Sequence, residues 1–368
     1  MGADGRGLPG LYPKVRIATS FAPMRKLLVL LGVLALIHIA FLFVHPRGAS
    51  AARAHADVNV GIVFDLGGRG DKSFNDGAYV GGVRAERELG AHVRFIEPGD
   101  GSDRESGLRL LAAEGMDLVI GVGFIFTDDL SQLAKDYPRT KFAGIDFAVS
   151  TDRAGNPIPP PPNVAALKFR EEQGSFLVGA LAALESKTKK VGFVGGMDSP
   201  LIQKFEVGYR AGVKRVCPSC TVLVGYAGVT PEAFRNPGKG KELALSQYGQ
   251  GADIIYHASG STGLGVFEAA RQTGHLAIGV DADQYGEAPG HVLTSMVKGV
   301  DEAVFDVIKL VKEHRFQGGI YQLGLAEHGV GYVYDAQNRS LIPDSVRARV
   351  EQLSSEIVAG RINVPSTR

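Results

Sequence analysis

Residues 58–76 read VNVGIVFDLGGRGDKSFND, and this stretch indicates the fold more clearly than any other part of the chain. An apolar run, Val58–Phe64, ends in a glycine-rich turn, and a helix-like pattern begins near Phe74. A strand that is apolar throughout is typical of a parallel sheet covered by helices on both faces. The stretch therefore predicts the first β–α unit of an α/β protein.

The β–α alternation recurs along most of the chain. Strands are expected at Val58–Phe64, Val93–Ile96, Leu118–Gly121, Lys141–Ile145, Val164–Lys168, Val191–Val194, Thr221–Tyr226, Ile254–His257, Leu276–Val280 and His291–Val297. Helices are expected at Phe74–Leu89, Asp103–Glu114, Asp129–Tyr137, Glu171–Leu184, Leu201–Val216, Gly238–Gln250, Gly263–Gln272 and Val300–His314. Two successive series of roughly 100 residues each predict two doubly wound, Rossmann-like lobes. Beyond Gln317 the pattern is less regular.

One segment interrupts the alternation. Asp152–Asn163 contains four consecutive prolines, Pro159–Pro162, which fit neither a helix nor a central strand. We interpret it as a stiff connector at a lobe boundary. The expected N-terminal lobe then comprises residues 57–162 and 290–316, and the C-terminal lobe comprises residues 163–289 and 317–368. Ligands of such proteins bind in the crevice at the carboxyl ends of the strands.

Residues 1–56 form a separate segment. Arg25 and Lys26 precede an 18-residue apolar run, Leu27–Val44, and two A-x-A sites follow it at Ala49–Ala51 and Ala54–Ala56. This pattern predicts either a cleaved secretory signal or a retained membrane anchor, with an N-terminal extension if translation starts at Met24. Basic residues before the run place the bulk of the chain outside the cytoplasm. We expect a periplasmic or cell-surface protein, with residues 27–44 as the candidate anchor.

The net charge of +1 hides two opposite parts. Residues 1–56 contain seven Lys and Arg against Asp4, a net of +6, and the remainder carries 33 basic and 38 acidic residues, a net of −5. The exported part has no basic excess of the kind that nucleic-acid binding requires. We therefore expect no nucleic-acid partner.

The end of the first strand supplies the first candidate site residues. Asp65 follows the strand directly, and Phe74 and Asn75 fall in the first turn of the next helix, so all three can face the crevice. An ordinary turn-forming Asp and a core Phe would give the same pattern. Ser73 and Asp76 have the spacing of a capping box at the helix start.

The chain resembles the basic membrane protein family, the substrate-binding proteins of ABC transporters. The ordered segments that carry this resemblance extend from about Val58 to about Lys312 and are VGIVFDLGGRGDKSFNDGAYVG, DLVIGVGFIFTDDL, KFAGIDFA, VGFVGGMDSPLIQKFEVGYRAGV, PGKGKELA, ASGSTGLGVFEAA and IGVDADQYGEAPGHVLTSMVKGVD. The resemblance implies a periplasmic-binding fold of the first type, with two α/β lobes joined by a three-stranded hinge. It also implies a nucleoside ligand whose base lies between two aromatic rings.

The resemblance implies roles for eight residues. Asp65 and Asn75 would read the base, while Phe74 and Phe234 would stack on it. Asp281, Lys298 and Asp146 would hold the ribose, with Asp129 as the rival of Asp146, and Gly260 would let the sugar approach the backbone. The residue types suit this ligand, because a purine offers a π face and a donor–acceptor edge, and carboxylates accept hydrogen bonds from hydroxyls.

The expected protein is a monomeric binding protein that delivers its ligand to a membrane permease, without enzymatic activity, cofactor or metal. Three carboxylates against one lysine favour a nucleoside over a nucleotide. A nucleoside-processing enzyme on a Rossmann-like fold and a ligand sensor for a membrane receptor are the alternatives. The family's lipid-anchored cysteine after the signal is missing, which leaves the mode of anchoring open.

Several other motifs have simpler interpretations. Gly260–Gly265 and Gly192–Gly196 lack the spacing of a phosphate loop and are interpreted as turn glycines. Cys217 and Cys220 have CxxC spacing, which in an exported protein favours a small structural disulfide. The nine histidines form no zinc motif, and His257 alone lies near the predicted crevice.

Overall fold

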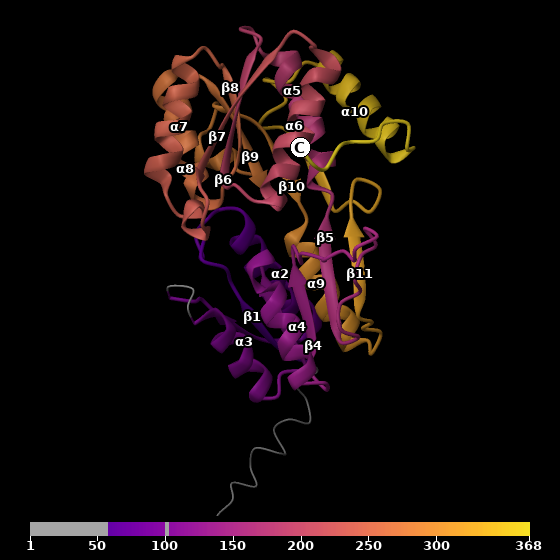
Figure 1. Ribbon diagram of the computed structural model, residues 1–368. Helices are drawn as coiled ribbons and strands as arrows, with labels where there is room; N and C mark the ends of the chain where they lie inside the picture. The colour runs from indigo at the N-terminus through magenta and orange to yellow at the C-terminus, as the bar shows by residue number, and fades with distance from the viewer. Residues whose placement is uncertain (1–57, 100–102) are drawn as a thin grey trace, which may run out of the picture. The chain divides into compact units, whose positions relative to one another are not determined.

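Strand β1 (Asn59–Val63) and helix α2 (Phe74–Leu89) form the predicted first β–α unit in a computed structural model, which describes residues 58–99 and 103–368 (Figure 1). The predicted signal or anchor at residues 27–44 lies outside the described residues. Every contact given below lies within the compact unit formed by residues 56–368. Within the described part of the chain, no helix is long and apolar enough to cross a membrane.

Twelve strands of the described chain form two six-stranded sheets. The first sheet is parallel throughout, in the order β11 (Gly319–Leu323), β5 (Val164–Phe169), β4 (Lys141–Ile145), β3 (Leu118–Val122), β1 and β2 (His92–Ile96). The second has the order β12 (Val330–Tyr332), β10 (Val292–Lys298), β9 (Leu276–Asp281), β8 (Ile254–Ala258), β6 (Lys190–Met197) and β7 (Thr221–Gly228). Only β12 runs antiparallel to its neighbour among these described strands. The two sheets therefore repeat one topology.

Helices cover both sheets, as the apolar strands predict. The first lobe carries α2, α3 (Arg104–Ala113), α4 (Thr127–Asp136) and α9 (Val300–Lys312). The second carries α5 (Glu171–Glu185), α6 (Pro200–Val216), α7 (Pro237–Gly249), α8 (Gly263–Thr273) and α10 (Asp344–Val358). The short helices η2 (Phe124–Phe126), η3 (Pro231–Phe234), η4 (Gly260–Thr262) and η5 (Tyr285–Glu287) follow strand ends. The expectation of an α/β protein with two doubly wound lobes is confirmed.

The chain crosses between the lobes three times. The crossings follow β5, β10 and β11, since β5 and β11 belong to the first sheet while β10 and β12 belong to the second. Helix α9 returns to the first lobe and packs against α2. Three crossing segments match the expected three-stranded hinge.

The expected lobe boundaries are wrong for three strands. The sequence pattern predicts β5 and β11 in the second lobe, but both lie in the first sheet, and it predicts β10 in the first lobe, but β10 lies in the second sheet. The proline-rich segment before residue 164 connects β4 to its immediate neighbour β5, so it does not separate the lobes. Proline excludes a helix or a central strand from a segment, but it carries no information about which sheet the next strand joins.

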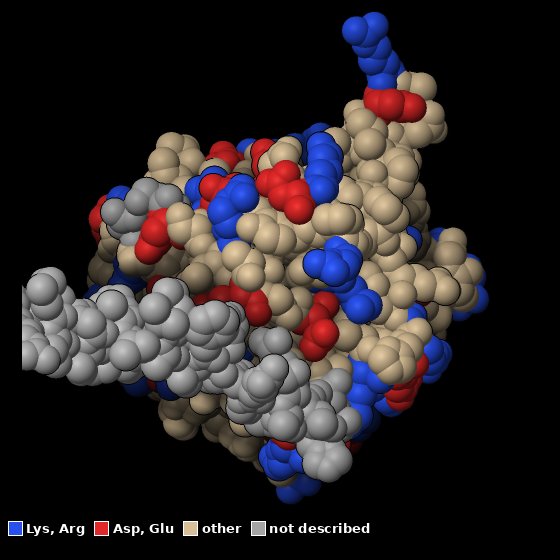
Figure 2. All heavy atoms as spheres, turned by 90° about the horizontal axis from the view of Figure 1, so that it is seen from below, with Lys and Arg blue, Asp and Glu red and all other residues tan. Residues whose placement is uncertain are grey.

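Acidic and basic side chains alternate on one face of the protein. In the view of Figure 2, blue and red side chains are interspersed, and the described residues show no broad area of a single charge there. The buried side chains of the sheets and helices are mostly Val, Ile, Leu, Phe and Ala. The core thus rests on apolar burial, as expected for a chain with only two cysteines.

Candidate ligand-binding site

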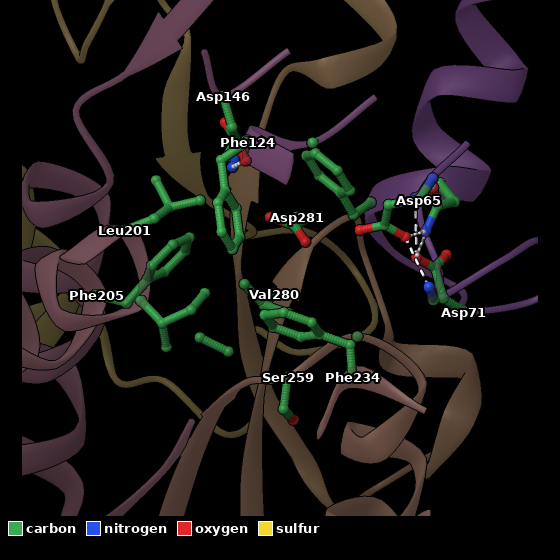
Figure 3. Close-up of a pocket in the computed structure, with 18 residues that line it drawn as sticks. Asp65, Asp71, Phe124, Asp146, Leu201, Phe205, Phe234, Ser259, Val280 and Asp281 are labelled. Atoms are coloured by element: carbon green, nitrogen blue, oxygen red, sulfur yellow. Dashed lines mark hydrogen bonds and ion pairs between the residues drawn. The ribbon is translucent and has the colours of Figure 1, made fainter. Parts of the chain in front are cut away.

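A cavity lies where the carboxyl ends of the strands of both lobes meet (Figure 3). All eight residues predicted from the sequence line it, namely Asp65, Phe74, Asn75, Asp146, Phe234, Gly260, Asp281 and Lys298. The space between the lining residues, including the part open to solvent, is about 520 Å³. The other lining residues are Gly67, Asp71, Gly123, Phe124, Leu201, Ile202, Phe205, Ala258, Ser259 and Val280.

Asp65 and Asn75 form a fixed pair on one wall. Asn75 Nδ2 donates to Asp65 Oδ1 (2.7 Å) and to Asp71 Oδ2 (3.2 Å), and Gly67 N also donates to Asp65 Oδ1 (2.8 Å). Asn75 Oδ1 accepts from Asp65 N (3.2 Å). The amide of Asn75 is thus engaged within the wall, and Asp65 Oδ2 is the acceptor left toward the cavity. Burial raises the pKa of Asp65 to about 6, although the hydrogen bond from Asn75 opposes the shift.

Asp71 caps helix α2, so the predicted capping box is wrong. Its two carboxylate oxygens accept from the backbone N–H groups of Ser73 (3.0 Å), Asn75 (2.8 Å) and Asp76 (3.1 Å). Ser73 makes no side-chain cap, and its hydroxyl instead donates to Asp281 Oδ2 (3.0 Å) in the other lobe. Because Asp71 supplies an acceptor to three unpaired N–H groups, Ser73 is available for a contact between the lobes.

Lys298, at the end of β10, is buried between charges of both lobes. Its Nζ lies 2.7 Å from Asp146 Oδ2 and 3.5 Å from Glu171 Oε1, and Lys298 and Glu171 are 3% and 0% exposed. Burial by itself lowers the pKa of Lys298, but Asp146, Glu171 and Asp281 outweigh it and hold that pKa above its ordinary value. The ammonium group is therefore charged and already paired.

Aromatic rings surround the same ammonium group. Lys298 Nζ lies 4.9 Å from the ring centroid of Phe74, 5.1 Å from that of Phe169 and 5.4 Å from that of Phe205. Such cation–π contacts fix the position of the ammonium group as well as stabilising it. Lys298 is consequently held in the cavity wall by ion pairs and by aromatic contacts.

Asp146 and Asp281 each present an unsatisfied oxygen in the cavity. Asp146 Oδ1 and Asp281 Oδ1 are buried and accept no hydrogen bond from any described residue. Burial raises the pKa of Asp281 to about 7, and the charge of Lys298 opposes this shift. Burial also raises the pKa of Asp146, against the opposing charge of Lys298. A ligand that donates hydrogen bonds would satisfy both oxygens.

Aromatic side chains form the apolar walls. Phe124 points into the cavity from η2, and Phe234 faces it from η3 beside Val280 and Ser259 (Figure 3). Gly196 of β6 lies against Phe234, since a Cβ at residue 196 would lie 2.4 Å from Cδ1 and Cε1 of that ring. The interpretation of Gly192–Gly196 as turn glycines is wrong, because they lie within β6 and Gly196 makes room for a cavity ring.

The two candidate aspartates lie in different places. Asp129 pairs with Arg104 (3.0 Å) and does not line the cavity, whereas Asp146 does. Phe124, Phe205 and Asp71 were missed by the sequence predictions. Phe124 follows Gly123 at the end of β3, a strand-end position equivalent to that of Asp65, and this position was the available signal.

The remaining motifs keep structural roles. Cys217 and Cys220 form a disulfide at the end of α6, as predicted. His257 is fully buried in β8, and burial lowers its pKa to about 4, although the hydrogen bond with Gln284 opposes the shift. Within the described residues, no group of His, Cys, Asp and Glu could hold a metal ion.

Residues 58–368 match the Bmp family, described as ABC transporter substrate-binding protein PnrA-like. The chain belongs to this family. The family comprises binding proteins rather than enzymes, so the expectation of a non-enzymatic, extracytoplasmic substrate-binding protein is confirmed, and the alternative of a nucleoside-processing enzyme is wrong.

Relatives and solved structures agree with this assignment. An uncharacterized lipoprotein of Pyrococcus abyssi is 36% identical over 324 residues, which cover 84% of this chain and 77% of the relative. The ABC transporter nucleoside-binding protein BmpA of Lactococcus lactis is 30% identical over 368 residues, covering 93% and 100%. The crystal structure of an ABC transporter solute-binding protein from Aeropyrum pernix K1 superposes with a TM-score of 0.76 at 32% identity and covers 84% of this chain and 94% of that one. The two-lobed periplasmic-binding fold is thereby confirmed.

Proposed function

We propose that this protein captures a purine nucleoside between its lobes and delivers it to a membrane permease. The observation that carries the proposal is the pair of buried, unpartnered oxygens, Asp146 Oδ1 and Asp281 Oδ1, in a cavity that is otherwise lined by aromatic rings. Ribose hydroxyls are donors that suit these oxygens. The name of the Lactococcus lactis relative, a nucleoside-binding protein, supports the same ligand class.

The base occupies the aromatic part of the cavity. Phe74 and Phe234 provide π faces for stacking, with Phe124 as a third ring. Asp65 Oδ2 accepts from the edge of the base, and Asn75 contributes by holding Asp65 through its engaged amide. Replacing Phe74 with Ala should cost about 1–3 kcal/mol of binding, as base stacking on an aromatic ring generally does. An unchanged affinity of this variant would count against the pocket.

The charge of the cavity favours a nucleoside over a nucleotide. Among the described residues that line it, Lys298 is the one cation against four aspartates, and it is already paired with Asp146. A phosphate would therefore meet net negative charge without a free counter-ion. Isothermal titration calorimetry with adenosine, guanosine, inosine and AMP tests this point. AMP binding as tightly as adenosine would contradict it.

The ligand itself can be identified directly. Residues 57–368 purified without denaturation should carry a nucleoside, which mass spectrometry detects after its release from the protein. A wild-type protein that co-purifies with a different class of small molecule and does not bind any of the four test compounds would overturn the proposal. Delivery to a permease predicts that cells lacking this chain lose high-affinity uptake of the same nucleoside.

Attachment to the membrane belongs to the same proposal. Residues 27–44 serve as the signal or the anchor, and the Pyrococcus abyssi relative is named a lipoprotein, which supports a membrane-attached protein. Fractionation of cells that express the full chain, compared with a chain whose residues 27–44 are replaced by a cleavable signal, tests the anchor. The protein without residues 27–44 should then leave the membrane fraction.

A further inference from the structure

We propose that Gln284 is a clasp between the lobes, a positioning residue that stabilises the closed form without touching the ligand. The proposal rests on the proposed function for its effect on ligand release, but its effect on closure depends on the two lobes alone. Gln284 Nε2 donates to the backbone oxygen of Lys72, 3.1 Å away and in the other lobe. Gln284 is 2% exposed and does not line the ligand cavity.

The second lobe fixes the direction of the Gln284 amide. Gln284 Oε1 accepts from Val280 N (2.8 Å) and faces His257 Nε2 (3.1 Å). Because His257 is neutral at neutral pH, its Nε2 carries the proton that this acceptor needs, while Ser259 Oγ lies 3.3 Å from Nδ1 and donates there. With Oε1 held in this way, Nε2 points toward the first lobe.

Two further contacts within the second lobe restrict the Gln284 side chain. Gln284 N donates to Ser295 Oγ (3.0 Å), which fixes its backbone. A Cβ at Gly279 would lie 2.8 Å from Gln284 Oε1, so the glycine provides the space that the side chain occupies. The contacts that orient the donor thus all come from the second lobe.

The first lobe presents an equally fixed acceptor. Lys72 has a φ of 56°, in the left-handed region, and its N–H donates to Asp76 Oδ2 (3.2 Å). The next residue, Ser73, donates its hydroxyl to Asp281 Oδ2 (3.0 Å). Two adjacent residues of the first lobe thus contact two nearby residues of the second. Of these two contacts, the Lys72–Gln284 hydrogen bond is the one that lies outside the ligand cavity.

This geometry makes the bond specific to closure. When the lobes separate, Gln284 keeps its bonds to Val280, His257 and Ser295 and loses only the bond to Lys72. A hydrogen bond of this kind changes an equilibrium constant by a factor of roughly 2 to 12. Gln284 therefore biases the open–closed equilibrium toward the closed form by that factor, with or without a ligand.

The variant Gln284→Glu tests the clasp. It keeps both acceptor contacts in the second lobe and replaces the donor with an oxygen that faces the Lys72 carbonyl. Spin labels at the exposed positions of Lys135→Cys on α4 and Gln272→Cys on α8 report the distance between the lobes. We expect a measurable closed population in the ligand-free wild type and a population that is lower by roughly 2- to 12-fold or more in the variant. Gln284→Met, which removes both the donor and the acceptor of the amide without adding charge, should shift it in the same direction.

A matched control comes from Gln247, another buried glutamine. Its Nε2 donates to the Phe193 carbonyl (2.9 Å) within the second lobe, so Gln247→Glu adds a similar buried carboxylate without altering a contact between lobes. We expect the control to lower thermal stability and to leave the distance distribution unchanged. A wild type without a measurable closed population, or variants at Gln284 that match the wild type, would overturn the clasp.

Ligand kinetics separate this proposal from the proposed function. With inosine as the probe, we expect Gln284→Glu to release ligand faster by a similar factor while the association rate stays the same. Equal release rates in Gln284→Glu and Gln247→Glu would contradict the clasp. A wild type that does not bind inosine would count against the nucleoside function, and the distance measurement would still decide the role of Gln284.

Discussion

Asp146 and Asp281 occupy equivalent positions in the two lobes. Asp146 follows β4 and Asp281 ends β9, and these strands hold the same place in the order of their sheets. Both residues have left-handed backbones, with φ of 61° and 65°, and each has one buried oxygen without a partner. Strained non-glycine residues of this kind tend to cluster at binding sites. Each lobe thus contributes to the cavity an aspartate with a left-handed backbone and one unpartnered oxygen.

At about pH 8, above the raised pKa of Asp281, Asp146→Asn and Asp281→Asn should each weaken nucleoside binding by about 1.5–3 kcal/mol, because each then replaces a charged acceptor with a neutral one. Calorimetry with inosine and guanosine measures the loss. Asp129→Asn is the matched control, since Asp129 pairs with Arg104 outside the cavity. A loss of similar size in the control would show that the effect is not specific to the cavity.

Gly196→Ala should weaken ligand binding as much as Phe234→Ala does, because the added methyl group displaces the Phe234 ring. The expected cost is about 1–3 kcal/mol, the range for stacking of a base on an aromatic ring. Gly249→Ala is the control, since a Cβ there meets nothing within 4 Å. An unchanged affinity in Gly196→Ala would show that Phe234 does not contact the ligand.

The stability of the closed, ligand-free protein should fall as the pH rises from about 4 to about 7. The pKa of Asp281 is raised from 3.8 to about 7, so the folded protein retains a proton that the unfolded chain releases in this range. The stabilisation is complete below the unfolded pKa and is lost as the pH passes the folded pKa. Asp65, with a pKa raised to about 6, acts in the same direction.

Urea denaturation at about pH 5 and about pH 8 checks this dependence. We expect Asp281→Asn to reduce the pH-dependent part of the unfolding free energy by on the order of 2 kcal/mol. A profile for Asp281→Asn that is as steep as that of the wild type would mean that Asp281 is ionised throughout the range.

Removing the disulfide should lower stability without changing ligand affinity. Cys217 and Cys220 close a short loop at the end of α6, for which chain entropy predicts a contribution of about 2 kcal/mol. Neither residue lines the cavity. The double variant Cys217→Ser/Cys220→Ser therefore separates the two properties, measured by urea denaturation and calorimetry. A change in affinity would indicate that this loop influences the ligand cavity between the lobes.

The sequence predicted most elements well because most strands were largely apolar and were separated by turn residues and helix-like stretches. Strands β11 and β12 and helix α10 were not predicted, since the strands are short and largely half-buried and the helix buries only Val350, Leu353 and Ile357. Strand order was also out of reach of the pattern. The residues of β5 and β10 do not indicate which strands pair with them, because those neighbours come from distant parts of the chain.

The cavity residues were predicted through strand ends and through the family resemblance. Contacts between the lobes could not be predicted in this way. Ser73 has the spacing of a capping residue, and only the tertiary structure reveals that Asp71 caps the helix and that Ser73 meets Asp281. Gln284 likewise has no local signal, since its partner Lys72 lies more than two hundred residues earlier in the chain.

The three crossings between the lobes limit how the protein can open. A single connecting segment would let one lobe swivel freely about its bonds, whereas three segments that follow β5, β10 and β11 must all deform together. Twisting would stretch one segment while compressing another, so the easiest motion is a bend that the three share. The two lobes therefore return to the same register after each opening, and the halves of the cavity are realigned without a search through orientations.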